Sequence, residues 1–396
     1  MSNRRPFFET VVGRRGQRRP TRQGRRPDPY DKIHRIESFA LPIDDQFSSP
    51  LFSDLPGEVR DLIYEYALAD YEDLGNAYEL DTCYRRPDYM APRKTDTALL
   101  RTCQAVYNDA WYLPWTLAQH TFFLTAPDRK PKNNTEPHQM ERVSKLIERL
   151  HPDVLSRRKE VHNVQVFAQL YILEPGNSLN NVLQIPYFMP RTVTITIRHT
   201  DIWFWETDRP IYIRTPWINT VRFPTSVTTL RIQLESLQRR QPQIDYVVAR
   251  AQQEWYFTRD DDVHLVSTAA PTATRWTGSS TWVNRRWVRD EDDQEPGVVH
   301  YYMSTLVFKP ANMTEDENGY MARNAGKHAR RTIEVPPDIA AKTNIPGTGY
   351  ASLLTGRFEE MGITNKTPAS EAVRCFREFL AEESRRNELN AAPVDE

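Results

Sequence analysis

The chain has 396 residues, a formal net charge of -1, a hydrophobic fraction of 39% and a mean hydropathy of -0.68. This length accommodates about two domains of roughly 150 residues each. The 29 prolines against 14 glycines indicate much irregular chain. No apolar run approaches the roughly 20 residues of a membrane helix, and the first residues lack the apolar segment of a secretory signal. We therefore expect a nuclear or cytoplasmic protein with no membrane partner.

Motifs that carry chemistry are not found in the sequence. Cys83, Cys103 and Cys375 are too few and too scattered for a disulfide framework, which indicates a reducing compartment. The nine histidines show no metal-binding spacing, and no phosphate-binding glycine loop or nucleophile elbow is present. We therefore predict no metal, no cofactor and no catalytic residue.

Residues 1–45 form an arginine-rich tail that we expect to be disordered, because residues 1 to about 30 contain few apolar side chains that could form a core. Its first 35 residues hold ten arginines and one lysine against three acidic residues. A solvated tail is the first interpretation. A nuclear import signal is the second, and its candidate residues are Arg14, Arg15, Arg18, Arg19, Arg25 and Arg26. A nucleic-acid contact is the third, because clustered arginines release counterions from nucleic acid.

Residues 51–68, LFSDLPGEVRDLIYEYAL, predict an amphipathic helix that opens a helical module over residues 46–126. Asp54 is placed to cap this helix, Pro56 suits its first turn, and Glu58 favours the positive helix end. One side of the 3.6-residue period is apolar, and we expect burial of Leu55, Val59, Leu62, Ile63, Tyr66 and Ala67.

A polar excursion over residues 70–96 has the proline and aspartate content of a loop. A second helix is then predicted from a Thr97 cap to a stop at Pro114, with apolar residues at three- and four-residue intervals. We expect the two helices to pack as a hairpin. The run HTFFLT over 120–125 predicts a short strand that closes the module.

The segments LPGEVRDLIYEYAL, ALLRTCQAVYNDAW and HTFF together resemble the N-terminal signature of F-box-like proteins of filamentous fungi. In F-box modules two such helices form the docking surface for the Skp-type adaptor of cullin-RING ubiquitin ligases, so the resemblance implies a protein partner of that kind. The positions that match the first F-box helix are Leu55, Pro56, Val59, Ile63 and Tyr64. Those that match the second are Leu100, Cys103 and Tyr107. The excursion between the helices is longer than the F-box spacing.

The body over residues 127–310 begins with a predicted helix at 136–150. Residues 161–173 fit either a helix or a strand. Strands are predicted near 192–198 and 229–235, where TVTITIR and TTLRIQL alternate with an offset of 37 residues. This offset leaves room for a crossover between two parallel strands, and a helix from Ile244 to Trp255 follows that can cover the sheet.

Two further regions complete the predicted fold. Residues 255–310 predict short antiparallel strands added to the sheet edge, and the last of them is an alternating strand near 299–308. The C-terminal region, 311–396, is expected to pack loosely around a helix near 368–386 whose face carries Ala372, Cys375, Phe376 and Phe379. The predicted fold class is α+β with an α/β-like body. An N-terminal helical hairpin is packed on, or joined to, a mixed, repeat-like sheet with covering helices.

The residues after the first parallel strand are rich in aromatic side chains. A recognition surface is one interpretation, because aromatic side chains anchor binding hot spots, and its residues are Trp203, Trp205, Tyr212 and Trp217. The other interpretation is that these side chains cap the strands and fill the core, since aromatic residues are ordinary strand formers. His199, Asp201 and Glu206 are the candidates for acid and base chemistry if the protein is an enzyme.

These observations favour a non-enzymatic interaction adaptor, in which the F-box-like module docks a protein partner and the body presents a recognition surface. In this interpretation the chain is a substrate receptor of a ubiquitin ligase. The alternatives are a nuclear protein that contacts nucleic acid through its basic tail, and a structural domain or enzyme with a site near His199.

Overall fold

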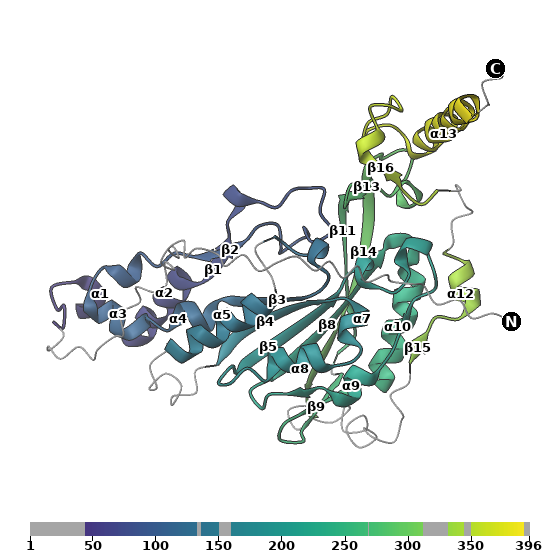
Figure 1. The fold of residues 1–396 in the computed structure, drawn as a ribbon. Coiled ribbons are helices and arrows are strands. Elements are labelled where there is room, and N and C mark those ends of the chain that lie inside the picture. The colour runs from purple at the N-terminus through teal and green to yellow at the C-terminus, as the bar shows by residue number, and fades with distance from the viewer. Residues whose placement is uncertain are drawn as a thin grey trace, which may run out of the picture. The chain divides into compact units, whose positions relative to one another are not determined.

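A mixed nine-stranded sheet organises the protein, and helices lie beside it (Figure 1). The fold is α+β, as the sequence predicts. The computed structural model describes residues 44–132, 136–149, 160–267, 269–311, 332–343 and 350–391. The six arginines of the predicted import signal lie outside the described residues.

The strand order of the sheet is β3, β4, β5, β8, β14, β10, β9 and β7, with β11 also paired to β14. The first four strands run parallel to one another. The bounds of the nine strands are Gln119–Leu124 for β3, Val161–Ala168 for β4, Pro190–Ile197 for β5, Arg222–Phe223 for β7, Thr229–Leu237 for β8, Tyr256–Arg259 for β9, His264–Ser267 for β10, Thr272–Ser279 for β11 and Val298–Pro310 for β14.

The predicted pair of parallel strands is confirmed. Strands β5 and β8 pair in parallel, and Val193 lies opposite Leu230, so the register reproduces the 37-residue offset of the sequence. Residues 161–168, where the sequence left helix and strand open, form strand β4 beside β5. The predicted module strand at 120–125 corresponds to β3, which pairs with β4 and therefore belongs to the large sheet.

Strand β14 is antiparallel, as predicted, but it lies inside the sheet. It pairs with β8 on one side, and with β11 and β10 on the other. The prediction that residues 255–310 add antiparallel strands beside the parallel ones is therefore confirmed by β9, β10, β11 and β14. Strand β14 has 13 residues, which is long enough to hold β11 and β10 as successive partners along one side.

One face of the sheet is apolar and is covered by helices (Figure 1). Alternate side chains such as Val193, Ile195 and Ile232 point into this core, as the two-residue strand period requires. The predicted helix at 244–255 is confirmed as α10. The helices with side chains in or against this core are α4 (Leu113–Leu117), α5 (Glu136–Arg149), α7 (Leu170–Leu173), α8 (Asn177–Leu183), α9 (Pro216–Thr220), α10 (Gln241–Glu254) and α12 (Pro337–Ala341).

The N-terminal helices differ from their predicted bounds. The helix predicted from residue 51 is divided into α1 (Pro50–Ser53) and α2 (Gly57–Leu68), and Pro56 is the residue that precedes α2. Asp54 makes no capping hydrogen bond to the helix and instead accepts one from the Ser53 hydroxyl at 2.6 Å. The predicted Asp54 cap is therefore wrong.

The second predicted helix is also divided. Its parts are a short 3-10 turn, Leu99–Arg101, followed by α3 (Gln104–Ala110) and α4 (Leu113–Leu117). Cys103 interrupts it, because its backbone is extended with φ -156° and ψ 165°. Pro114 lies in the first turn of α4, where no amide donor is needed, so it does not end the helix as predicted.

The two ends of the polar excursion pair with each other as a small two-stranded ribbon. Strand β1 (Asp70–Glu72) pairs antiparallel with β2 (Arg93–Thr95), which corrects the expectation of an irregular loop. Arg93 binds Asp70 at 2.7 Å across this ribbon. The ends of the excursion are thereby held together, and the chain between them turns back over the sheet residues Phe123 and Phe167 through Tyr89.

The C-terminal region contains its own apolar cluster. Helix α13 (Ala369–Ala391) buries Ala372 and packs Cys375, Phe376 and Phe379 against it, which confirms the predicted helix face. Arg286 forms a fully buried ion pair with Glu291 at 2.6 Å and donates hydrogen bonds to two backbone oxygens just before α13. Three short strands form a second sheet: β12 (Thr281–Trp282), β13 (Arg285–Arg286) and β16 (Leu353–Leu354). A separate two-stranded sheet pairs β6 (Tyr212–Ile213) with β15 (Ile333–Glu334).

Candidate functional site

Helix α2 turns its apolar stripe to solvent. The exposed fractions are 39% for Val59, 65% for Leu62, 38% for Ile63 and 91% for Tyr66. We call these four residues the α2 stripe. The expectation that it is buried is wrong for the described residues, because the helix packs through its opposite side.

The buried side of α2 consists of Tyr64 and Leu68, which are fully enclosed. At about 100° per residue these two positions lie opposite the α2 stripe. They pack against Val106, Ala110 and Leu113 of the following helices. This cluster accounts for the fold of the module without any contribution from the stripe.

The F-box-like residues are divided between the two sides of the module. Val59 and Ile63 are exposed, and of the two residues that precede the helix Leu55 is half-buried and Pro56 is exposed. Tyr64 is fully buried, and Leu100 and Cys103 pack beside it. Tyr107 is half-buried on α3. The structure therefore leaves the α2 stripe, rather than all eight positions, as the surface that a partner can reach.

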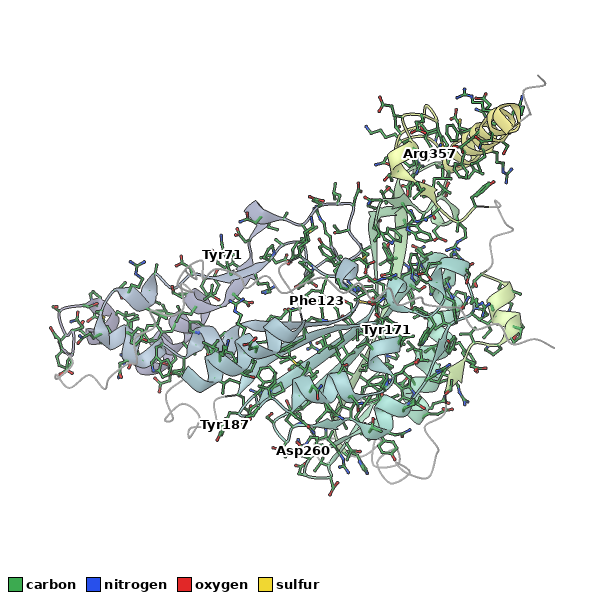
Figure 2. The ribbon with its side chains drawn as sticks, viewed as in Figure 1. Tyr71, Phe123, Tyr171, Tyr187, Asp260 and Arg357 are labelled. Carbon is green, nitrogen blue, oxygen red and sulfur yellow. The ribbon has the colours of Figure 1, made fainter. Side chains whose placement is uncertain are left out.

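The four aromatic candidates do not gather on one surface. Trp205 is buried with Trp282 and Trp287, and Trp217 is buried in the main core. Trp203 and Tyr212 are half-buried and stack with ring centroids 6.3 Å apart. Tyr171, labelled in Figure 2, contacts the edge of Trp203 and is exposed. The burial of Trp205 and Trp217 agrees with the interpretation that these side chains fill the core.

The acid and base candidates are each bound to other groups. The His199 Nδ1 atom lies 3.1 Å from the Ser236 hydroxyl, while Asp201 is held by Arg198 at 2.6 Å. Glu206 is at the surface beside Arg129. Burial, followed by the charge of Arg240 and other arginines, lowers the pKa of His199 well below its usual value. Within the described part of the chain no hydrogen bond joins His199 to either carboxylate.

The second face of the large sheet is polar and carries a groove of about 480 Å³. A chain of side-chain hydrogen bonds crosses it: Gln165 donates to Thr196 at 2.9 Å, and Thr196 donates to Gln233 at 2.5 Å. Arg231 and Arg275 also line the groove. Gln165, Thr196 and Gln233 alternate with the buried apolar positions of β4, β5 and β8, so the sequence alternation predicts a polar face but not its groove.

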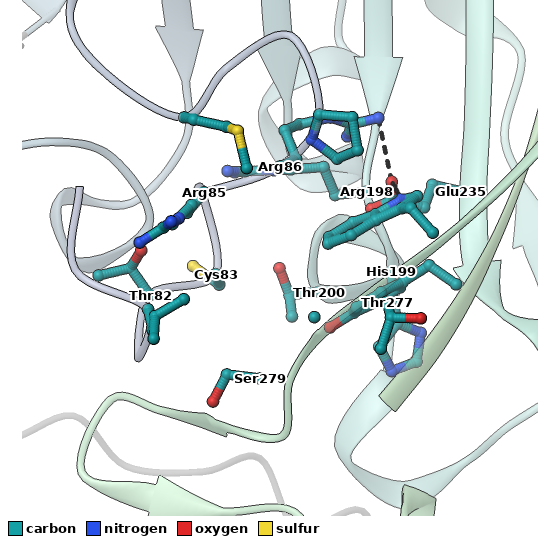
Figure 3. Close-up of a pocket in the computed structure, with 16 residues that line it drawn as sticks. Thr82, Cys83, Arg85, Arg86, Arg198, His199, Thr200, Glu235, Thr277 and Ser279 are labelled. Atoms are coloured by element: carbon teal, nitrogen blue, oxygen red, sulfur yellow. Dashed lines mark hydrogen bonds and ion pairs between the residues drawn. The ribbon is translucent and has the colours of Figure 1, made fainter. Parts of the chain in front are cut away.

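A smaller cavity of about 130 Å³ adjoins this groove, and Arg86, Pro87 and Trp276 line both (Figure 3). Arg86 from the excursion binds Glu235 of β8 at 3.0 Å, and both side chains are buried. The sequence analysis missed these residues. One signal was present, since Arg198 and Glu235 occupy equivalent positions, 37 residues apart, at the carboxyl ends of the two parallel strands.

Two kinds of feature were sought among the described residues and not found. No helix among them is both long and apolar enough to span a membrane. Within the same residues no group of three or more His, Cys, Asp or Glu side chains could hold a metal ion. The three cysteines are free and half-buried.

Comparisons with known proteins identify no relative. No protein-family model matches the chain, and searches of curated proteins and of solved structures found no match. The functional argument therefore depends on the sequence and the structure of this chain.

Proposed function

We propose that the protein is an interaction adaptor that docks a protein partner through the α2 stripe. The observation that carries the proposal is the exposure of Val59, Leu62, Ile63 and Tyr66 on one face of a helix whose other face is fully packed. Scattered apolar side chains are normal at a protein surface, but a contiguous apolar face is typical of an interaction site. Helix-in-groove recognition uses anchors at this i, i+3, i+4, i+7 spacing.

The partner that we propose is a Skp-type adaptor of a ubiquitin ligase. The LPGEVRDLIYEYAL pattern supports this choice, since Val59 and Ile63 of the resemblance lie on the exposed stripe. The exposed acidic residue Glu58 lies beside the stripe on the helix surface and provides part of a polar rim. In this function the body of the chain carries the second recognition surface, for which the polar groove is the candidate.

The direct test is the affinity of the purified full chain for a purified Skp-type adaptor, measured by calorimetry. We expect binding by the wild type. We expect Tyr66→Asp to weaken it by at least about thirtyfold, because aromatic anchors contribute about 2 kcal/mol or more to an interface. Tyr187→Asp is the matched control, since Tyr187 is another exposed tyrosine, 67% exposed, outside the module.

Three results would contradict the proposal. The first is a folded wild-type chain that does not bind the adaptor. The second is equal affinity of the wild type and Tyr66→Asp. The third is equal loss in Tyr66→Asp and Tyr187→Asp, which would show that general surface charge rather than the stripe governs binding.

A further inference from the structure

The cavity of about 130 Å³ lies where the excursion meets the carboxyl ends of β5 and β8. Thr82 and Arg86 come from the excursion, Arg198 and Thr200 follow β5, and Glu235 belongs to β8 (Figure 3). Because water occupies about 30 Å³ per molecule in the liquid, the cavity has room for roughly four waters or one compact ion. The carboxyl ends of parallel strands are the usual ligand-binding edge of such sheets.

Two buried arginines that line this cavity each have a hydrogen-bond donor without a partner. Arg86 is 7% exposed and Arg198 is 2% exposed, and each binds one carboxylate, Glu235 and Asp201 respectively. The Nη1 atom of each guanidinium is nevertheless buried and has no hydrogen-bond partner. An unpaired charged donor is costly to bury, so these two atoms need an acceptor.

Two neutral groups beside the arginines also lack hydrogen-bond partners. The Thr200 hydroxyl and the His199 Nε2 atom are buried without hydrogen-bond partners, and both residues line the cavity. The Glu235 Oε2 atom already receives the Arg86 ion pair and a hydrogen bond from Trp276 Nε1, each at 3.0 Å. Burial raises the pKa of the nearby Cys83 thiol, so this group is not an anion that competes for the arginines.

We propose that this cavity binds a compact tetrahedral oxyanion, either free phosphate or the phosphoryl group of a larger ligand. A tetrahedral oxyanion offers oxygens in several directions, which suits the donors that come from separate positions, Arg86, Arg198 and Thr200. Arginine is the preferred partner of phosphate oxygens because its planar fork donates more than one hydrogen bond. The adjoining groove gives a larger phosphorylated ligand a continuous path. This inference is independent of docking by α2.

Calorimetry with the full chain at constant ionic strength tests the proposal, with inorganic phosphate, phosphoserine, sulfate and acetate as probes. We expect phosphate and sulfate to bind with a Kd below about 1 mM, and acetate to bind at least about tenfold more weakly. Phosphoserine that binds more tightly than phosphate assigns the site to a phosphoryl group on a larger ligand. Phosphoserine that does not bind assigns it to the free ion.

A matched pair of threonine variants locates the binding. Thr200→Val removes a hydroxyl from the cavity at nearly constant volume, and we expect phosphate affinity to fall about tenfold because a hydrogen bond to a charged group is lost. Thr281→Val is the control, since Thr281 also has a buried, unpartnered hydroxyl but does not line the cavity. We expect it to bind phosphate like the wild type.

A double variant removes the arginine without leaving a buried carboxylate alone. Arg86→Met combined with Glu235→Gln should abolish phosphate binding while the chain remains folded, as circular dichroism would verify. The proposal is overturned if the wild type binds phosphate with a Kd above about 1 mM, if Thr200→Val and Thr281→Val bind it equally, or if acetate binds as tightly as phosphate.

Discussion

Helices α2 and α10 carry similar apolar periodicity, yet they use it in opposite ways. Helix α10 buries Ile244, Val247, Val248 and Ala251 against the large sheet. Helix α2 packs through Tyr64 and Leu68 and leaves its stripe in solvent. A periodic pattern therefore identifies an apolar face without showing what covers it, and the uncovered face of α2 is the one that supports a docking function.

The largest effect is expected when a charge is placed on the buried face of α10. Val247 is fully buried under the sheet, so Val247→Asp should destabilise the fold by more than about 4 kcal/mol, because an unpaired charge is buried. Chemical denaturation monitored by circular dichroism checks this, and Val247→Ile is the apolar control. A folded Val247→Asp chain of wild-type stability would contradict the assignment of this face to the core.

A smaller effect is expected on the packed side of α2. Leu68→Ala should lower the free energy of unfolding by about 3 kcal/mol, because Leu68 is fully enclosed with Tyr64 and Val106. The same denaturation experiment measures it. A change below about 0.5 kcal/mol would show that α2 does not pack through this side.

The next effect is a pH dependence of stability, and it comes from His199 in the body of the chain because α2 contains no histidine. Burial and the surrounding arginines lower the pKa of His199, so the folded chain does not take up the proton that the unfolded chain binds below about pH 6.5. Stability should therefore fall as the pH drops below this value, by about 1.4 kcal/mol per unit for this group. His199→Gln should flatten this part of the profile, and an unchanged slope would contradict it.

The smallest effect on stability is expected on the exposed side of α2. Leu62→Ser should change the free energy of unfolding by less than about 0.5 kcal/mol, since the side chain is mostly in solvent. Comparison with Leu68→Ala on the same helix makes the contrast between the two faces quantitative. Equal destabilisation by the two variants would show that the stripe is covered.

The sequence predicted best where local pattern and tertiary packing agree. Strand alternation and the offset of 37 residues predicted the β5 and β8 pair, because a two-residue period assigns each side chain to one face. The α13 face was predicted for the same reason, since Ala372 and its periodic neighbours are covered by one apolar cluster.

The features that failed depend on contacts between distant residues or on backbone conformation. Cys103 divides a periodic segment through an extended backbone that no side-chain pattern reveals. Asp54 has the residue type of a cap, but the chain enters the helix at Pro56. The cavity combines Arg86 with Arg198 and Glu235, which are more than 100 residues away along the chain, so only the fold brings them together.

The most direct measurement of the central claim is thiol labelling of Tyr66→Cys in the full chain, with and without a saturating Skp-type adaptor. The unaltered chain reports the background of its three half-buried native cysteines. The exposed stripe predicts fast labelling of the new thiol in the chain alone and a rate at least about tenfold lower in the complex. Slow labelling in the free chain, or an equal rate with the adaptor present, would contradict docking through α2.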